Sequence, residues 1–89
     1  MAWTISYTDT ALKQLKKLDR ALARRLVHFM DERVAVQADP RSTGKALSGP
    51  FLGSYWRYRV GDYRIICTIQ DSALTVLVIE IGHRKEVYR

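Results

Sequence analysis

The sequence is poor in the residues that bind metals and form cross-links. Its 89 residues include one cysteine, Cys67, and two histidines far apart in the chain, His28 and His83. A single cysteine excludes an internal disulfide, and no cysteine and histidine pattern at metal-ligand spacing is present. We therefore expect no metal and no other cofactor, and we expect Cys67 to be a buried thiol.

Long apolar runs are also missing. The longest, LTVLVIEI at residues 74–81, is far too short to cross a bilayer as a helix. The opening MAWTISYTDT lacks the apolar segment of a signal peptide. With only two prolines and no repeats, the chain is expected to form one domain over residues 1–89, located in the cytoplasm and not bound to a membrane.

Acidic residues are in the minority. Fifteen lysines and arginines oppose nine acidic residues, which gives a net charge of +6, and ten of the fifteen are arginine. Arginine binds phosphate through two parallel hydrogen bonds. Between residues 41 and 64 there are five basic residues and one acidic residue, Asp62. This excess favours a polyanionic partner, with nucleic acid as the first expectation and an acidic protein as the second.

Hydrophobic periodicity predicts two consecutive helices after a short N-terminal strand. Thr8, Asp9 and Thr10 are turn and cap formers that end the strand, and Asp19 can cap the second helix. The expected apolar stripes recur at three- and four-residue spacing. They are Ala11, Leu12, Leu15 and Leu18 in the first helix, and Leu22, Leu26, Phe29, Met30 and Val34 in the second.

The second half of the chain is predicted to be sheet. Residues 37–50 hold both prolines and two of the five glycines, so this segment is expected to be a loop. The fold expected is α+β: an N-terminal strand, a two-helix hairpin and a three-strand antiparallel meander, with both helices on one face of the sheet. The predicted strands are residues 2–7, 52–60, 63–70 and 74–81.

The stretch YWRYRVGDYR, residues 55–64, is predicted to form a tight hairpin with Gly61 and Asp62 as its turn. Antiparallel register then pairs Arg59 with Arg64, and alternation puts Arg57 on the same face. Opposed like charges destabilise a sheet, so this face is expected to bind an anion. The other face is expected to enter the core through Trp56, Tyr58, Val60, Ile65 and Cys67.

The place of Glu80 depends on the next turn. A three-residue loop at residues 71–73 would put Glu80 opposite Arg64, whereas a two-residue loop would put it opposite Tyr63. The sequence leaves both registers open.

Four segments together resemble the RelE superfamily of bacterial type II toxins. They are the helical start ALKQLKKLD, the connector KALSGPFLGSYW, the hairpin RYRVGDYRII and the ending VIEIGHRKEVYR. The resemblance implies two helices packed on a twisted antiparallel sheet with a basic concave face. It also implies a RelB-like antitoxin as partner, with operator DNA reached only through the antitoxin complex. The implied activity is metal-independent cleavage of mRNA in the ribosomal A site, by attack of the ribose 2′-hydroxyl on the adjacent phosphate.

The resemblance also implies the site residues. Arg57 and Arg59 stand where the family carries lysine or arginine, and Arg64, Arg84 and Tyr88 match its other functional positions. A guanidinium stays protonated at neutral pH, so proton transfer is assigned to His83 or Tyr88. The predicted catalytic residues are Arg59, Arg64, His83, Arg84 and Tyr88, and the predicted RNA-binding residues are Lys45, Tyr55, Arg57 and Arg59.

Two rival functions remain. A ParE-like toxin would share the fold and the antitoxin but would inhibit DNA gyrase by binding. A nucleic-acid-binding module without catalysis would explain the charge alone. The presence of Arg64, Arg84 and Tyr88 favours RNA cleavage over both.

Overall fold

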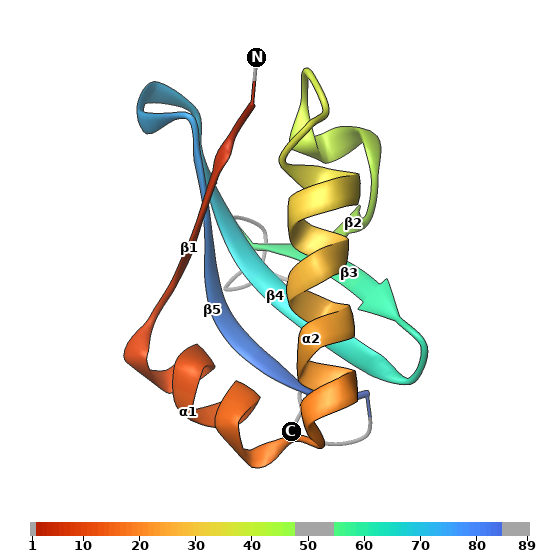
Figure 1. The fold of residues 1–89 in the computed structure, drawn as a ribbon. Coiled ribbons are helices and arrows are strands. Elements are labelled where there is room, and N and C mark those ends of the chain that lie inside the picture. The colour runs from red at the N-terminus through yellow and green to blue at the C-terminus, as the bar shows by residue number, and fades with distance from the viewer. Residues whose placement is uncertain (1, 48–54, 85–89) are drawn as a thin grey trace.

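The computed structural model describes residues 2–47 and 55–84 of the chain (Figure 1). The fold consists of two helices and a sheet of four main strands, and a short fifth strand extends the sheet. The elements are β1 (Thr4–Tyr7), α1 (Asp9–Lys17), α2 (Arg20–Phe29), β2 (Lys45–Ala46), β3 (Trp56–Val60), β4 (Tyr63–Gln70) and β5 (Thr75–His83). A π-helical turn, Met30–Val34, continues α2, and 3₁₀ turns cover Pro40–Ser42 and Asp71–Ala73.

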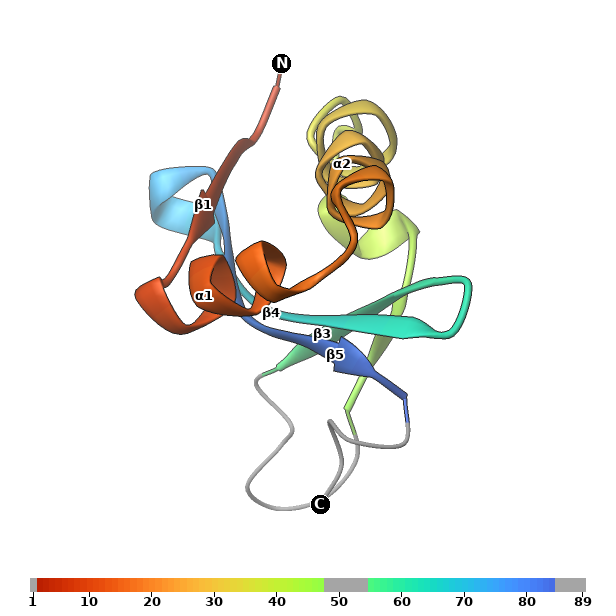
Figure 2. The same ribbon diagram turned by 60° about the horizontal axis from the view of Figure 1, so that its bottom comes forward.

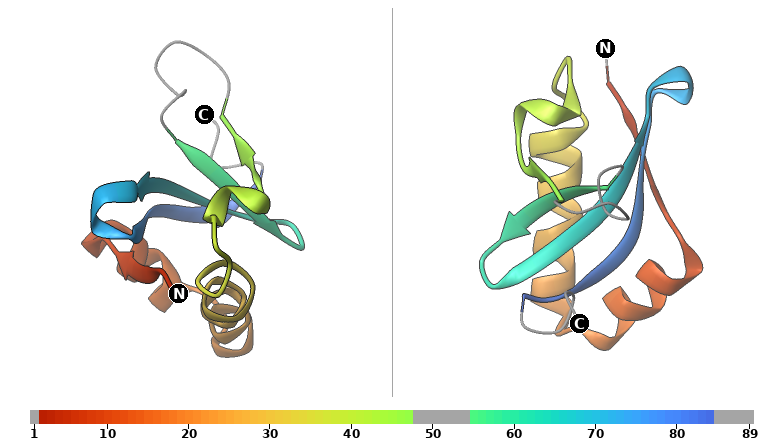
Figure 3. Two further views of the ribbon diagram at one scale, coloured as in Figure 1. Left: turned by 90° about the horizontal axis from the view of Figure 1, so that it is seen from above. Right: turned by 180° about the vertical axis from the view of Figure 1, so that it is seen from behind.

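The sheet has the strand order β1-β5-β4-β3-β2. β1 runs parallel to β5, while every other neighbouring pair is antiparallel. Both helices lie on one side of the sheet, as Figure 2 and the left-hand view of Figure 3 show. The predicted α+β architecture is therefore confirmed, and none of the described helices is long and apolar enough to span a membrane.

The helices begin where their cap residues predict. The Thr8 side chain accepts a hydrogen bond from the Ala11 amide, and the Asp19 carboxylate accepts from the amides of Ala21 and Leu22. Leu18 and Asp19 between the helices have extended ψ angles of 157° and 139°. As a result α1 and α2 meet at a steep angle (Figure 1) and do not lie side by side as an antiparallel pair.

The core lies between the helices and the sheet. The predicted stripe of α2 is confirmed, because Leu26, Met30 and Val34 are buried. Tyr58 is fully buried too, and its ring meets that of Phe29 edge to face at 6.1 Å. The core is completed by Ala11, Leu15, Val60, Ile65, Cys67, Val76, Val78 and Ile81. Burial raises the pKa of the Cys67 thiol, as expected for a cysteine that serves packing.

The segment predicted as a loop, residues 37–50, contains the strand β2. Lys45 pairs with Arg57, and Ala46 pairs with Trp56. Gly44 makes this possible, because its φ is 82° and a side chain there would collide with the Arg57 carbonyl and with the Trp56 indole. A strand of two residues is too short to leave a periodic signal in the sequence.

Two tyrosines of the core offer a matched test of this packing. The Tyr58 hydroxyl donates to the Pro40 carbonyl at 2.7 Å. The buried Tyr7 hydroxyl has no hydrogen-bond partner among the described residues, and its burial, together with Asp31, raises the pKa of Tyr7 to about 12. The same substitution should therefore act in opposite directions at the two positions.

We expect Tyr58→Phe to lower the free energy of unfolding by about 1–2 kcal/mol, because it leaves a buried carbonyl without its donor. Tyr7→Phe should leave the free energy of unfolding unchanged or raise it by up to about 1 kcal/mol, because the hydroxyl that it removes is buried without a partner. Urea unfolding of the two variants measures both effects. A larger loss for Tyr7→Phe than for Tyr58→Phe would contradict this assignment.

Candidate nucleic-acid interface

The hairpin of β3 and β4 carries the arginines in the predicted register. Arg59 pairs with Arg64, and Arg57 pairs with Ile66. Gly61 occupies the turn with a φ of 59°, a backbone conformation that glycine adopts without strain. The three arginines lie on the sheet face opposite the helices, which the right-hand view of Figure 3 presents with α2 behind the sheet. Neither Arg57 nor Arg59 forms an ion pair with a described carboxylate.

A β-bulge in β5 adds a carboxylate to this face. The connection after β4 spans four residues, 71–74, and ends with Leu74 in the left-handed conformation (φ 48°, ψ 44°). The β4–β5 register then shifts between Ile66 and Cys67, so that Glu80 lies opposite Ile66. Both sequence-based registers for Glu80 are therefore wrong, because the loop is longer than either assumed and the bulge inserts Ile79. Glu80 therefore lies on the sheet face that carries the three arginines of the hairpin.

The bulge is held from the side of β1 and α1. Pairing of β1 with β5 ends at Tyr7 and Val78. Beyond that point the Thr8 amide donates to the Val78 carbonyl at 3.0 Å, and the Thr8 hydroxyl donates to the Ile79 carbonyl at 3.3 Å. The Gln14 side chain of α1 then accepts from the Ile81 amide at 2.5 Å. The start of α1 thus replaces β1 as the neighbour of the bulged strand.

The bulge separates two predicted catalytic residues. His83 pairs with Tyr63, and their rings meet edge to face at 5.6 Å. Because Tyr63 packs against the core, the register places His83 on the helix side of the sheet. The arginines of the hairpin lie on the other side. Alternation places Arg84 on the arginine side with Glu80. Arg84 is exposed, and its amide donates to the Asp62 carbonyl at 2.8 Å.

The remaining predicted site residues extend the arginine face. Lys45 is exposed and lies opposite Arg57. Tyr55 is half-buried and precedes Arg57 by two residues, which in a strand gives the same side. Tyr88 lies outside the described residues. The structure thus brings Lys45, Tyr55, Arg57, Arg59, Arg64 and Arg84 to one face of the sheet, which we call the arginine face.

The arginine face offers cationic side chains that can bind phosphate. It also carries one carboxylate, that of Glu80. Among residues 2–47 and 55–84, no three histidine, cysteine or acidic side chains are grouped so that they could hold a metal ion. Sequence reasoning left the face of Glu80 open, because the bulge that sets its register has no local signal.

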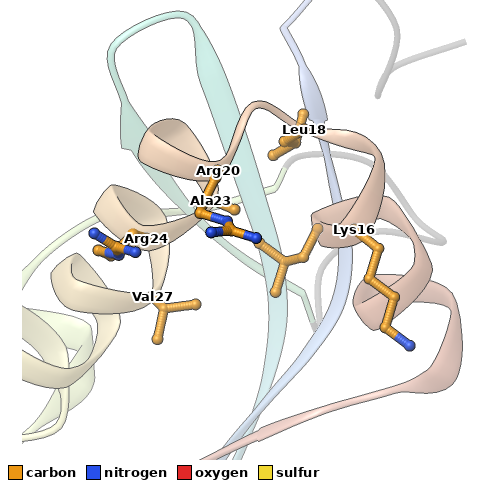
Figure 4. Close-up of a pocket in the computed structure, with 7 residues that line it drawn as sticks. Lys16, Leu18, Arg20, Ala23, Arg24 and Val27 are labelled. Atoms are coloured by element: carbon orange, nitrogen blue, oxygen red, sulfur yellow. The ribbon is translucent and has the colours of Figure 1, made fainter.

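A second surface feature lies between the helices. Apolar side chains of α1, α2 and their connection form an open groove of about 550 Å³, and cationic side chains stand around it (Figure 4). The apolar members are Leu15, Leu18, Ala23 and Val27, and the cationic members are Lys16, Arg20 and Arg24. We call this the interhelix groove.

Comparison with known proteins places the chain in a family. The family model for the ParE toxin of type II toxin–antitoxin systems matches residues 5–88. The chain belongs to this family. It is 30% identical to toxin RelG of Mycobacterium tuberculosis over 89 residues, all of this chain and 99% of that protein. It is 31% identical to toxin RelE of the same organism, over 96% of this chain and 84% of that one.

Solved structures share the fold of these toxins. The RelBE2 toxin–antitoxin complex of M. tuberculosis contains a chain that matches with a TM-score of 0.83 and 27% identity, over 97% of this chain and 95% of that one. The archaeal RelE–RelB complex of Pyrococcus horikoshii contains another, with a TM-score of 0.74 and 24% identity, over 98% and 100%. The resemblance to RelE-type toxins inferred from the four sequence segments is confirmed.

Gln14 gives a direct test of the bulge. Gln14→Leu should leave the Ile81 amide without its acceptor, and we expect the free energy of unfolding to fall by about 1–2 kcal/mol. Amide hydrogen exchange at Ile81 should accelerate in the same variant. Lys13→Leu, at an exposed neighbour on α1, is the control and should change neither quantity by a comparable amount. Unaltered stability and exchange in Gln14→Leu would show that the bulge is held by other contacts.

Proposed function

We propose that this chain is a cytoplasmic toxin that cleaves mRNA in the ribosomal A site, by attack of the ribose 2′-hydroxyl on the adjacent phosphate. The observation that carries the proposal is the arginine face, in which Arg59 opposes Arg64 with Arg57 beside them. A phosphodiester backbone carries an anion at every nucleotide, and guanidinium groups bind such anions through paired hydrogen bonds. The relatives named RelG and RelE support the same assignment.

The reaction needs phosphate binding, stabilisation of charge on the pentavalent phosphorus, and two proton transfers. Arg57, Arg59, Arg64 and Arg84 can supply the first two, with Lys45 and Tyr55 holding the flanking RNA. The proton acceptor has to be another group, since a guanidinium stays protonated at neutral pH.

We assign the acceptor to Glu80, because the bulge directs its carboxylate to the arginine face while His83 packs against Tyr63 on the other side. Glu80 is half-buried in the strand and forms no ion pair with the described residues. Tyr88 stays the proposed donor to the leaving 5′-oxygen, as its match to the family implies.

The proposed partner is a RelB-like antitoxin, as in the RelBE and RelE–RelB complexes whose toxin chains share this fold. The interhelix groove suits an amphipathic antitoxin segment, because its apolar lining would bury apolar side chains while Lys16, Arg20 and Arg24 would meet acidic ones. Operator DNA would be contacted only through the antitoxin complex.

Inhibition of DNA gyrase is the rival function, and the match to the ParE family model favours it. Expression of the chain alone in bacteria distinguishes the two. Messenger RNA cut in frame within translated codons supports the ribonuclease, whereas a gyrase-dependent DNA damage response with intact mRNA contradicts it. Co-expression of the antitoxin should abolish toxicity in either case.

Binding and chemistry should separate within the site. Arg57→Ala should weaken binding to programmed ribosomes in a salt-dependent way, because a phosphate contact contributes mainly electrostatic affinity. Glu80→Gln should slow single-turnover cleavage by about 10²- to 10⁴-fold with nearly unchanged ribosome binding, because a proton acceptor acts in the transition state. His83→Ala and Tyr88→Phe, run in parallel, test the other two groups. Cleavage by Glu80→Gln at the parental rate, with a slow His83→Ala, would transfer the role to His83.

A further inference from the structure

A second cationic cluster lies where α2 passes the turn of the β3–β4 hairpin. Arg25 and His28 of α2, together with Arg33 of the π-helical turn, recur at helical spacing and are exposed. Arg59 and Gly61 of the hairpin face them across an open groove of about 390 Å³. Its other lining residues are Phe29, Glu32 and Val60. We call this the α2–hairpin groove.

The two walls of this groove are fixed relative to each other by the core. Phe29 meets the buried Tyr58 ring edge to face, and Met30 is buried beneath the helix. At the turn, an Arg25 guanidinium nitrogen lies 3.7 Å from the position that a Cβ on Gly61 would occupy. The Arg25 side chain thus reaches the turn of the hairpin, where any residue with a Cβ at position 61 would contact its guanidinium group.

Charge in the groove is strongly one-sided. Three arginines and a histidine line it, with Glu32 as the one acidic member. None of these arginines forms an ion pair with a carboxylate of the described residues, whose ion pairs all involve Arg41. Arg59 belongs both to this groove and to the arginine face, so the two cationic surfaces are continuous around the edge of the sheet.

We propose that the α2–hairpin groove binds the phosphodiester backbone of RNA, next to the RNA held on the arginine face. Arginine residues of α2, its π-helical turn and β3 line one path, and a polymer with a charge at every nucleotide can follow that path from one surface to the other. The inference rests on the proposed function in that the arginine face holds RNA. It adds a second stretch of RNA backbone. Of the residues assigned to the reaction, only Arg59 would contact this stretch.

The test compares two double variants of equal charge. Arg25→Ala/Arg33→Ala removes two cations from the α2–hairpin groove, while Lys13→Ala/Lys17→Ala removes two exposed lysines of α1 that line neither groove. The affinity of each for a short unstructured RNA, and for ribosomes programmed with mRNA that lacks the 2′-hydroxyl in the A-site codon, is measured against salt. We expect the first variant to lose about 1.4 from the slope of log affinity against log salt, which corresponds to two contacts with single-stranded RNA. The second should keep the parental slope.

The outcomes separate this inference from the proposed function. In one outcome the parental protein binds RNA and the two double variants show the same slope of log affinity against log salt, whether or not that slope differs from the parental one. This result overturns RNA binding by the α2–hairpin groove and leaves RNA binding by the arginine face intact. Failure of the parental protein to bind either RNA overturns both. Unchanged RNA binding with loss of binding to an acidic peptide in Arg25→Ala/Arg33→Ala would assign the groove to a protein segment instead. Urea unfolding of both variants checks that the fold is retained.

Discussion

The bulge in β5 is the constraint on which the site depends. Side chains alternate along a strand, so one inserted residue exchanges the faces of everything after it. Val76 and Val78 reach the core before the bulge, and Ile81 reaches it afterwards. Regular alternation would instead point Glu80 into the core, where a carboxylate without a partner is costly. The contacts of Thr8 and Gln14 to the backbone of β5 therefore decide which side chains can meet a ligand.

The fold can hold like charges side by side on the arginine face because the opposite face of the same hairpin is deeply buried. Tyr58, Ile65 and Cys67 are each 0% exposed, and burial of such side chains stabilises by about 1.5–3 kcal/mol each. Repulsion between opposed like charges in a sheet costs a fraction of that, on the order of 0.2–1 kcal/mol. The hairpin can thus hold its arginines in position before any ligand arrives, and a bound anion would meet a preformed set of donors.

Helix α2 and its π-helical extension connect the separate surfaces. One stripe, Leu26, Met30 and Val34, is buried in the core. On one side of that stripe Arg20, Ala23, Arg24 and Val27 line the interhelix groove, and on the other Arg25, His28 and Arg33 line the α2–hairpin groove. An apolar partner segment and an anionic partner could therefore both use this helix without sharing its side chains.

Local chemistry made much of the fold predictable from the sequence. The pairing of Arg59 with Arg64 follows from the turn at Gly61 and Asp62, and it is confirmed. Asp19 caps α2 as predicted, and the apolar stripe of that helix is buried as its periodicity indicates. Each of these features depends on residues only a few positions apart, where turn geometry and side-chain period act directly.

Tertiary structure alone decided the rest of the site. The face of Glu80 depends on a bulge that Gln14 holds from 67 positions away in the chain. The strand β2 depends on the close approach of Gly44 to β3, and the α2–hairpin groove on the packing of Phe29 against Tyr58. The sequence determined which residues carry charge and which are apolar. Packing decided which residues from distant parts of the chain face each other, because contacts between remote segments leave no periodic or turn signal in either segment.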